Sequence, residues 1–170
     1  MEETTLLQTA RFSVTEVSRP GQPTKAVVRH PGAVAIIPLL SDGRICLIKN
    51  YRVAAGKSLI EIPAGTLELD EDPAITAVRE LKEETGYSSE TWREIAPPFF
   101  VSPGIMDERM YLFLATDLSE GEPEREAGEE IENLVVPFQD ALEMVRNGEI
   151  CDAKTIVGLL TYHTFVRGAE

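Results

Sequence analysis

Residues 65–87, GTLELDEDPAITAVRELKEETGY, decide the fold of this chain. Their second half predicts a helix, because Asp72 can cap the first turn and Pro73 suits the first helical position. Gly86 is placed to end this helix in the left-handed conformation that glycine adopts without strain. Spacing on a helical wheel puts four residues on the side that packs into a core: Ala74, Val78, Leu81 and Thr85.

Three carboxylates share the other side of the expected helix. At about 100° per residue, Glu83 and Glu84 fall within about 60° of Glu80, and we expect Glu84 on the solvent side. Like charges at this spacing weaken a helix unless something neutralises them. A divalent cation would do so, and oxygen ligands without His or Cys nearby favour Mg²⁺, with Mn²⁺ as a substitute. The alternative is a solvated acidic face, and the flanking residues decide against it.

The stretch resembles the signature of the Nudix hydrolases: Gly, five residues, Glu, seven residues, Arg-Glu, an aliphatic residue, any residue, Glu-Glu, any residue, Gly and an apolar residue. Every specified position matches, with Tyr87 a looser fit at the closing position. From its residues alone, the chain supports only a mixture of α and β structure. The resemblance implies an α/β fold of the Nudix type: an α/β/α sandwich with a mixed sheet, formed by one domain over residues 1–170.

The resemblance also assigns metal ligands within and beside the signature. It implies that Glu80 and Glu84 bind the cation directly, and that Glu83 binds a further ion or belongs to the hydrogen-bond shell of the attacking water. The carbonyl of Ala64 is a metal ligand in the family, and Gly65 permits the close backbone turn that would aim it.

Two further roles follow from the same resemblance. Arg79 is expected to pair with Glu71 and so to hold the loop against the helix. In the branch of the family that hydrolyses ADP-ribose, a Glu in a loop beyond the signature supplies the general base. Residues 121–130 are acidic and aperiodic, which indicates an exposed loop. We favour Glu129 as the base, and four alternatives stay open: Glu126, Glu130, Glu132 and Glu83.

Eight residues are predicted to bind substrate: Arg11, Arg29, Arg52, Glu61, Ser102, Pro103, Gly104 and Glu108. Pro103 lies sixteen residues beyond Tyr87, the offset of a proline in the ADP-ribose branch; read alone, Ser-Pro-Gly is simply a good turn. Similar enzymes place an arginine at the position of Arg52 against substrate phosphate, where a guanidinium binds in bidentate fashion. Arg11 and Arg29 lie within residues 1–31, an expected N-terminal β-ribbon that in this branch often crosses to the second subunit of a homodimer.

The remaining elements are read from local patterns. Strands are expected over 11–18, 25–29, 59–62, 91–96, 99–101 and 110–116, with another at 135–136. Residues 33–49 predict a hairpin around Ser41-Asp42-Gly43. Helical periodicity covers 138–147 and 153–166.

The overall charge constrains the partners of this protein. The formal net charge of −13 over 170 residues argues against a general nucleic-acid binder. The longest apolar run, residues 33–40, is far too short to cross a membrane, and the first residues lack the pattern of a signal peptide. We therefore expect a cytoplasmic enzyme that binds neither nucleic acid nor membrane.

The expected activity is metal-dependent cleavage of ADP-ribose to AMP and ribose 5-phosphate. The first alternative is a pyrophosphatase for other nucleoside diphosphate derivatives, such as nucleotide sugars or dinucleotides. The second is a non-catalytic Nudix module that binds a nucleotide.

Overall fold

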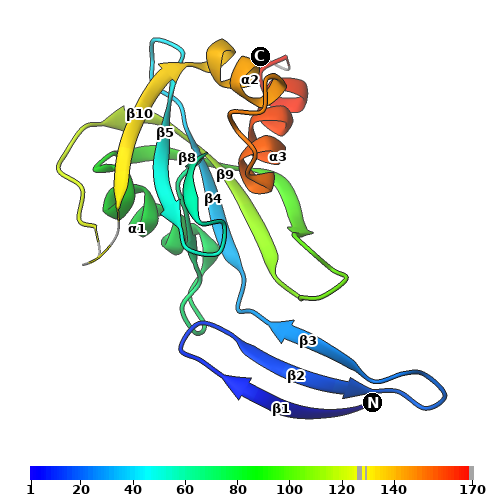
Figure 1. Ribbon diagram of the computed structural model, residues 1–170. Helices are drawn as coiled ribbons and strands as arrows, with labels where there is room; N and C mark the ends of the chain where they lie inside the picture. The colour runs from blue at the N-terminus through cyan, green and yellow to red at the C-terminus, as the bar shows by residue number, and fades with distance from the viewer. Residues whose placement is uncertain (126–127, 129, 169–170) are drawn as a thin grey trace.

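The computed structural model describes residues 1–125, 128 and 130–168. Figure 1 shows a body in which helix α1 (Pro73–Thr85) lies on one side of the strands, while α2 (Phe138–Arg146) and α3 (Ala153–Thr161) lie on the other. The three-stranded sheet formed by the N-terminal strands is a ribbon that reaches away from this body. No helix among the described residues is both long and apolar enough to cross a membrane. The predicted α/β/α sandwich with an N-terminal β-ribbon is confirmed.

The described residues of the body form two sheets. The larger has the order β7-β4-β9-β8 and is built from β4 (Ala33–Pro38), β7 (Ala64–Thr66), β8 (Ser88–Phe100) and β9 (Arg109–Ser119). It is mixed, because β4 pairs parallel to β9 and antiparallel to β7. The smaller sheet has the order β10-β5-β6, with β5 (Arg44–Arg52), β6 (Lys57–Glu61) and β10 (Ile131–Pro137).

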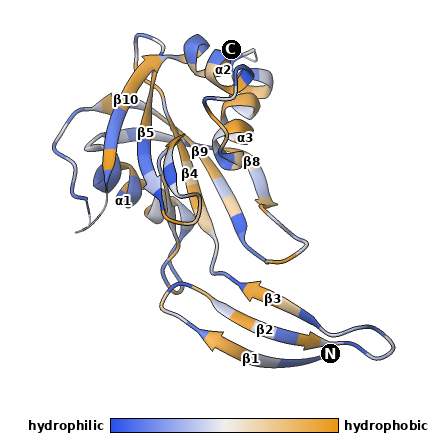
Figure 2. Ribbon diagram, viewed as in Figure 1, coloured by the Kyte–Doolittle hydropathy of each residue, from blue (hydrophilic) through white to orange (hydrophobic). Residues whose placement is uncertain are grey.

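Strand β4 occupies the centre of the molecule because both of its faces are apolar. Ala33, Ala35 and Ile37 face the core beside α2 and α3. Val34 and Ile36 face the second core, where Ala77 and Leu81 of α1 pack. A strand whose successive residues point to opposite faces reads as a continuous apolar run when helices cover both faces. Figure 2 shows β4 at the centre of the body, coloured mainly as a hydrophobic strand.

The prediction of a hairpin over 33–49 is wrong, because its two strands do not pair with each other. The turn forms, since the amide of Leu40 donates to the carbonyl of Arg44 at 2.8 Å. Beyond it, only Leu39 and Ile45 bridge, and β4 and β5 enter different sheets. The reason is that β9 and β7 already take both edges of the buried strand β4.

Other predicted elements also differ from the expectation in their bounds. The strands predicted at 91–96 and 99–101 form the single strand β8, whose register shifts between Ala96 and Phe99; Pro97 and Pro98 have no N–H to donate, and a bulge removes them from the ladder. The helix predicted over 153–166 ends as α3 at Thr161 and continues as a π-helical turn, Tyr162–Val166.

The N-terminal ribbon contains one strand more than predicted. Its order is β1-β2-β3, with β1 (Glu2–Gln8), β2 (Ser13–Ser18) and β3 (Lys25–Arg29). Strand β1 was missed because every residue in it is exposed, so its sequence carries no alternation between buried and solvated positions.

Helix α1 begins and ends where the sequence predicts. The carboxylate of Asp72 accepts the amide of Ala74 at 2.8 Å, and Gly86 closes the helix with φ of 80°. Its rotation differs from the helical wheel, because Ala74 and Val78 are exposed. The buried positions are Thr76, Ala77, Leu81, Glu84 and Thr85.

Gly86 meets a second requirement, which is space. A Cβ at Gly86 would lie 2.3 Å from the carbonyl oxygen of Gly121 and 2.8 Å from the amide nitrogen of Pro123. The chain after β9 therefore runs directly against the end of α1, and only a glycine permits this approach.

We predict that Gly86→Ala lowers the free energy of unfolding by about 3 kcal/mol, because overpacking adds to the strain of a left-handed alanine. Gly148→Ala is the matched control, since Gly148 has φ of +83° and nothing within 4 Å of its added Cβ. That control should lose only about 1 kcal/mol. Urea unfolding measures both, and equal losses would show that the backbone contact at Gly86 is unimportant.

Candidate active site

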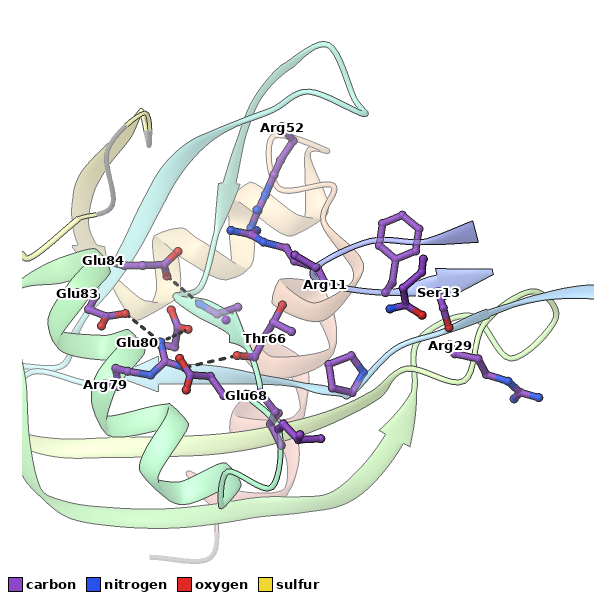
Figure 3. Close-up of a pocket in the computed structure, with 18 residues that line it drawn as sticks. Arg11, Ser13, Arg29, Arg52, Thr66, Glu68, Arg79, Glu80, Glu83 and Glu84 are labelled. Atoms are coloured by element: carbon purple, nitrogen blue, oxygen red, sulfur yellow. Dashed lines mark hydrogen bonds and ion pairs between the residues drawn. The ribbon is translucent and has the colours of Figure 1, made fainter. Parts of the chain in front are cut away.

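A pocket of about 620 Å³ opens between α1, the segment 64–69 and the near end of the ribbon. Most of the residues predicted for the site line it: Arg11, Arg29, Arg52, Ala64, Arg79, Glu80, Glu83 and Glu84. Figure 3 shows the three glutamates along one wall and the side chain of Arg11 extending toward them from the ribbon.

One side of the pocket, formed by Glu80, Glu83 and Glu84, is its acidic wall. Arg79 contacts two of these carboxylates and the loop before the helix. Its Nη2 lies 3.1 Å from Oε2 of Glu71, which is the predicted pair. Its Nη1 lies 2.7 Å from Oε1 of Glu80 and 3.0 Å from Oε2 of Glu83. Nη2 also donates to the carbonyl of Thr66 at 3.4 Å. One guanidinium thus joins the loop before α1 to two carboxylates on the helix.

The charge states of this cluster follow from those contacts. The hydrogen bond from Arg79 and the amide of Glu68 lower the pKa of Glu71 to about 2. The hydrogen bond with Glu71, followed by the charges and bonds of Glu80 and Glu83, raises the pKa of Arg79. Glu71 and Arg79 therefore stay ionised at neutral pH.

Gly65 is required by the position of Glu80. A Cβ at Gly65 would lie 1.8 Å from the carboxylate carbon of Glu80. No left-handed φ is involved at this residue. The signature glycine, which lies within strand β7 rather than at the turn expected from the sequence, therefore makes room for a carboxylate pressed against the backbone.

Glu84 lies in an environment that the sequence did not predict. We expected a solvent-side residue, but Glu84 is only 4% exposed. Its Oε2 accepts the amide of Ala64 at 2.9 Å. This contact ties α1 to β7, and it explains why the helix is rotated away from the orientation in which Ala74 and Val78 would be buried.

The wall has the donor chemistry of a site for a hard cation. Among the described residues, no group of three His, Cys, Asp or Glu side chains is arranged to hold a metal ion. The physical reason is that Arg79 binds Glu80 and Glu83, while Glu84 binds the backbone. All three carboxylates nevertheless line the same pocket, and carboxylate oxygens are what Mg²⁺ and Mn²⁺ prefer.

Arg52 and Glu61 form a close ion pair at the pocket. Nε of Arg52 lies 2.8 Å from Oε1 of Glu61, and Nη2 lies 2.6 Å from Oε2. Glu61 is fully buried, and it does not line the pocket itself. Burial raises its pKa, but hydrogen bonds and charge from Arg52 and Lys154 outweigh burial and lower it. The hydrogen bond with Glu61 raises the pKa of Arg52.

The loop between β8 and β9 supports the ribbon. Ser102, Pro103, Gly104 and Glu108 belong to it, and none of them lines the pocket. The amide of Val28 in β3 donates to the carbonyl of Ile105 at 2.8 Å. Oε1 of Glu108 lies 3.7 Å from Nδ1 of His30. These predicted substrate-binding residues therefore lie beside the base of the ribbon.

Arg29 is bound on both sides. Its Nη1 donates to Asp107 at 2.9 Å, and its Nε donates to Glu3 at 2.8 Å. Figure 3 shows its guanidinium pointing away from the α1 glutamates. Asp107 was not predicted, and it is 78 residues from Arg29 along the chain, so no sequence spacing could have indicated the pair.

The acidic loop is anchored to the last turn of α1. The amide of Glu124 donates to the carbonyl of Glu83 at 3.0 Å. Nε of Arg125 donates to the carbonyl of Glu84 at 3.0 Å, and Nδ2 of Asn133 donates to the carbonyl of Thr85 at 2.8 Å. Both ends of the loop therefore start beside the helix that carries the carboxylates.

Of the candidate general bases, Glu129 and Glu126 lie outside the described residues. Glu130 and Glu132 are exposed, and Glu132 lies on β10. Glu83 lines the pocket.

Comparison with known proteins places this arrangement in a family. The NUDIX domain model matches residues 29–156, more than half of the chain. The chain is 40% identical over 166 residues to the ADP-ribose pyrophosphatase of Bacillus subtilis (strain 168), which covers 91% of this chain and 89% of that protein. It is 39% identical over 153 residues to the methanol dehydrogenase activator of Bacillus methanolicus, covering 88% of this chain and 82% of that protein.

A solved structure, the crystal structure of an ADP compounds hydrolase, shares the fold with a TM-score of 0.82 at 20% identity and covers 99% of this chain and 94% of that one. The chain belongs to the Nudix family, and it is a Nudix hydrolase. The resemblance found in residues 65–87 is confirmed.

We predict that Gly65→Ala folds normally but binds Mn²⁺ about tenfold more weakly, because the new Cβ displaces the flexible end of Glu80. Calorimetric titration and a thermal melt measure the two effects. Gly104→Ala is the control, since its added Cβ meets nothing within 4 Å. Unchanged Mn²⁺ affinity in Gly65→Ala would remove Glu80 from the ligand set.

We also predict a pH-dependent effect of Glu71→Gln. The pKa of Glu71 in the folded protein, about 2, lies below the ordinary value of 4.5, so its ionisation stabilises the fold above pH 4.5 and this contribution disappears as the pH falls toward 2. The variant should lose about 1 kcal/mol at pH 7. Urea unfolding from pH 7 to pH 3 should show the loss shrinking, with exposed Glu90→Gln as the control. A loss that stays constant over this range would contradict the assignment.

Proposed function

We propose that this chain hydrolyses the pyrophosphate bond of ADP-ribose, giving AMP and ribose 5-phosphate, and that it requires Mg²⁺ or Mn²⁺. The observation that carries the proposal is a single pocket lined by three α1 carboxylates together with Arg11 and Arg52. A volume of about 620 Å³ lies within the range of sites for small molecules and cofactors. The similarity to an ADP-ribose pyrophosphatase along most of both chains supports the choice of substrate.

The acidic wall would hold the cation that this reaction requires. When bound, a divalent cation neutralises the anionic phosphates and lowers the pKa of a bound water. Glu80, Glu83 and Glu84 would hold the cation with the carbonyl of Ala64. Arg79 places two of these carboxylates, through Nη1 contacts of 2.7 Å and 3.0 Å to Glu80 and Glu83. It acts by orienting them, since its other bonds fix the loop before the helix.

The arginines of the pocket would bind the substrate's phosphates. A guanidinium recognises phosphate through parallel N–H donors, and Arg52 lines the pocket with its Nε edge already held by Glu61. Arg11 extends into the pocket from the ribbon. Local positive groups of this kind attract an anionic substrate even in a protein of net charge −13.

The proton of the attacking water needs an acceptor near the pocket. We propose Glu129 for this role. Its segment is bracketed by Arg125 and Asn133, which bind the last turn of α1. Glu126, Glu130, Glu132 and Glu83 remain the alternatives.

We further propose that residues 1–170 act as one domain and form a homodimer through the ribbon of residues 1–31. In support, β1 is exposed along its whole length. Leu6 and Leu7 are 58% and 52% exposed, and an exposed apolar sheet of this kind commonly marks a protein contact.

Turnover of a substrate panel tests the function. Purified protein with Mg²⁺ is given ADP-ribose, nucleotide sugars and dinucleotides, and AMP or the matching nucleoside monophosphate is quantified. We expect the highest kcat/KM for ADP-ribose. If ADP-ribose is among the poorest substrates, the proposed substrate is wrong and another nucleoside diphosphate derivative takes its place. If no member of the panel is hydrolysed, the protein is a non-catalytic Nudix module.

We predict that Glu84→Gln keeps the fold but lowers kcat at least about 100-fold. The amide oxygen of Gln can still accept the amide of Ala64, which Glu84 now does at 2.9 Å, so the melting temperature should change little. Steady-state kinetics and a thermal melt provide the two readouts, with exposed Glu90→Gln as the control. Wild-type turnover in Glu84→Gln would exclude it as a ligand.

A further inference from the structure

A chain of alternating charges leads from the pocket into the protein. It begins with Arg52, which lines the pocket, and passes to Glu61 at 2.6 Å. Nζ of Lys154 binds the same Oε2 of Glu61. Lys154 also lies 3.1 Å from Oδ2 of Asp152. Two cations and two anions thus form one connected series, and Lys154 is 93 residues from Glu61 along the chain.

Burial makes Glu61 dependent on both cations. Its side chain is fully buried, and that of Lys154 is only 13% exposed. A buried carboxylate without partners carries a large desolvation cost, and removing one partner of such a pair leaves uncompensated charge. Lys154 is therefore not a mobile surface group that water could readily replace, whereas the Arg52 side chain is 40% exposed at the pocket.

The start of α3 fixes the position of Lys154. Asp152 caps this helix, since its Oδ2 accepts the amide of Thr155 at 3.0 Å and the hydroxyl of Thr155 at 2.6 Å. The same hydroxyl oxygen accepts the amide of Ile62, the residue directly after β6, at 2.9 Å. The helix start is therefore bonded to the strand that carries Glu61, and Lys154 has little freedom to move relative to it.

The geometry leaves one edge of the Arg52 guanidinium for a ligand. Glu61 takes Nε and Nη2, which is the side edge of the fork. Nη1 makes no hydrogen bond to a described residue. A guanidinium held along one edge presents the other in a fixed direction, which lowers the entropic cost of binding an anion.

We propose that Lys154 is a positioning residue for substrate binding: it holds the buried carboxylate of Glu61 in place, and Glu61 in turn aims the guanidinium of Arg52 at a phosphate of the substrate. This deepens the proposed function and rests on it for the identity of the ligand. Lys154 touches neither the pocket nor the reacting atoms, so it acts only through Arg52.

A double-mutant cycle with Lys154→Met and Arg52→Met tests the proposal. Lys154→Met should raise KM for ADP-ribose about tenfold with kcat within about twofold, because binding is weakened equally in ground and transition states. In the Arg52→Met background, the same change should have almost no effect, because residues that act through one another are non-additive. Lys154→Arg keeps the charge and should restore KM to near the wild-type value.

Two further measurements keep the result interpretable. Lys49→Met, at an exposed position on β5, controls for the loss of one positive charge. Calorimetry with a non-hydrolysable methylene analogue of ADP-ribose measures affinity without turnover and should show the same tenfold loss. If Lys154→Met does not fold in a thermal melt, Lys154→Gln replaces it, since it keeps a donor toward Glu61 but removes the charge.

The outcomes separate the two proposals. Unchanged KM and analogue affinity in Lys154→Met, or an equal loss in both backgrounds, overturn the role of Lys154. Lack of turnover of ADP-ribose by the wild-type protein refutes the proposed function, and the analogue titrations then still decide the role of Lys154. If the wild-type protein also fails to bind the analogue, both the proposed function and the role of Lys154 are overturned.

Discussion

The site depends on one guanidinium that binds several carboxylates at once. Without Arg79, the like charges of Glu80, Glu83 and Glu71 would repel each other across a short distance. Nη1 of Arg79 instead lies 2.7 Å and 3.0 Å from the two helical carboxylates. Because the same side chain also reaches the loop through Glu71 and Thr66, the acidic residues are held in place before any ligand arrives.

The fold supplies the rigid support for this cluster. Ala77 and Leu81 bury the inner face of α1 against β4 and β9. Glu84 reaches the backbone of Ala64 from the same helix, and Gly86 lets the chain after β9 pack on its end. Three contacts of different kinds thus fix one helix, which limits how far its carboxylates can shift relative to the segment 64–69.

The sequence predicts what is local and fails where partners are distant. Asp72, Gly86 and the pair of Arg79 with Glu71 lie within one short stretch, so residue spacing carries the information. The rotation of α1 depends on a bond from Glu84 to Ala64, twenty residues away, and a helical wheel cannot include it. Lys154 and Asp107 meet their partners across 93 and 78 residues, and such contacts have no signature in a single sequence.

Net charge is a poor guide to this pocket because each cation has its own partner. Arg29 is bound by Glu3 and Asp107, and Arg79 by the acidic wall. Arg52 differs, because the carboxylate that holds it is fully buried and also binds Lys154. Asp152 also binds Lys154, so the four side chains balance in charge, and what distinguishes Arg52 is that Glu61 holds it along one edge while its side chain lines the pocket. A strongly acidic chain can therefore still present a guanidinium in a fixed direction at the pocket, where an anionic ligand would meet it.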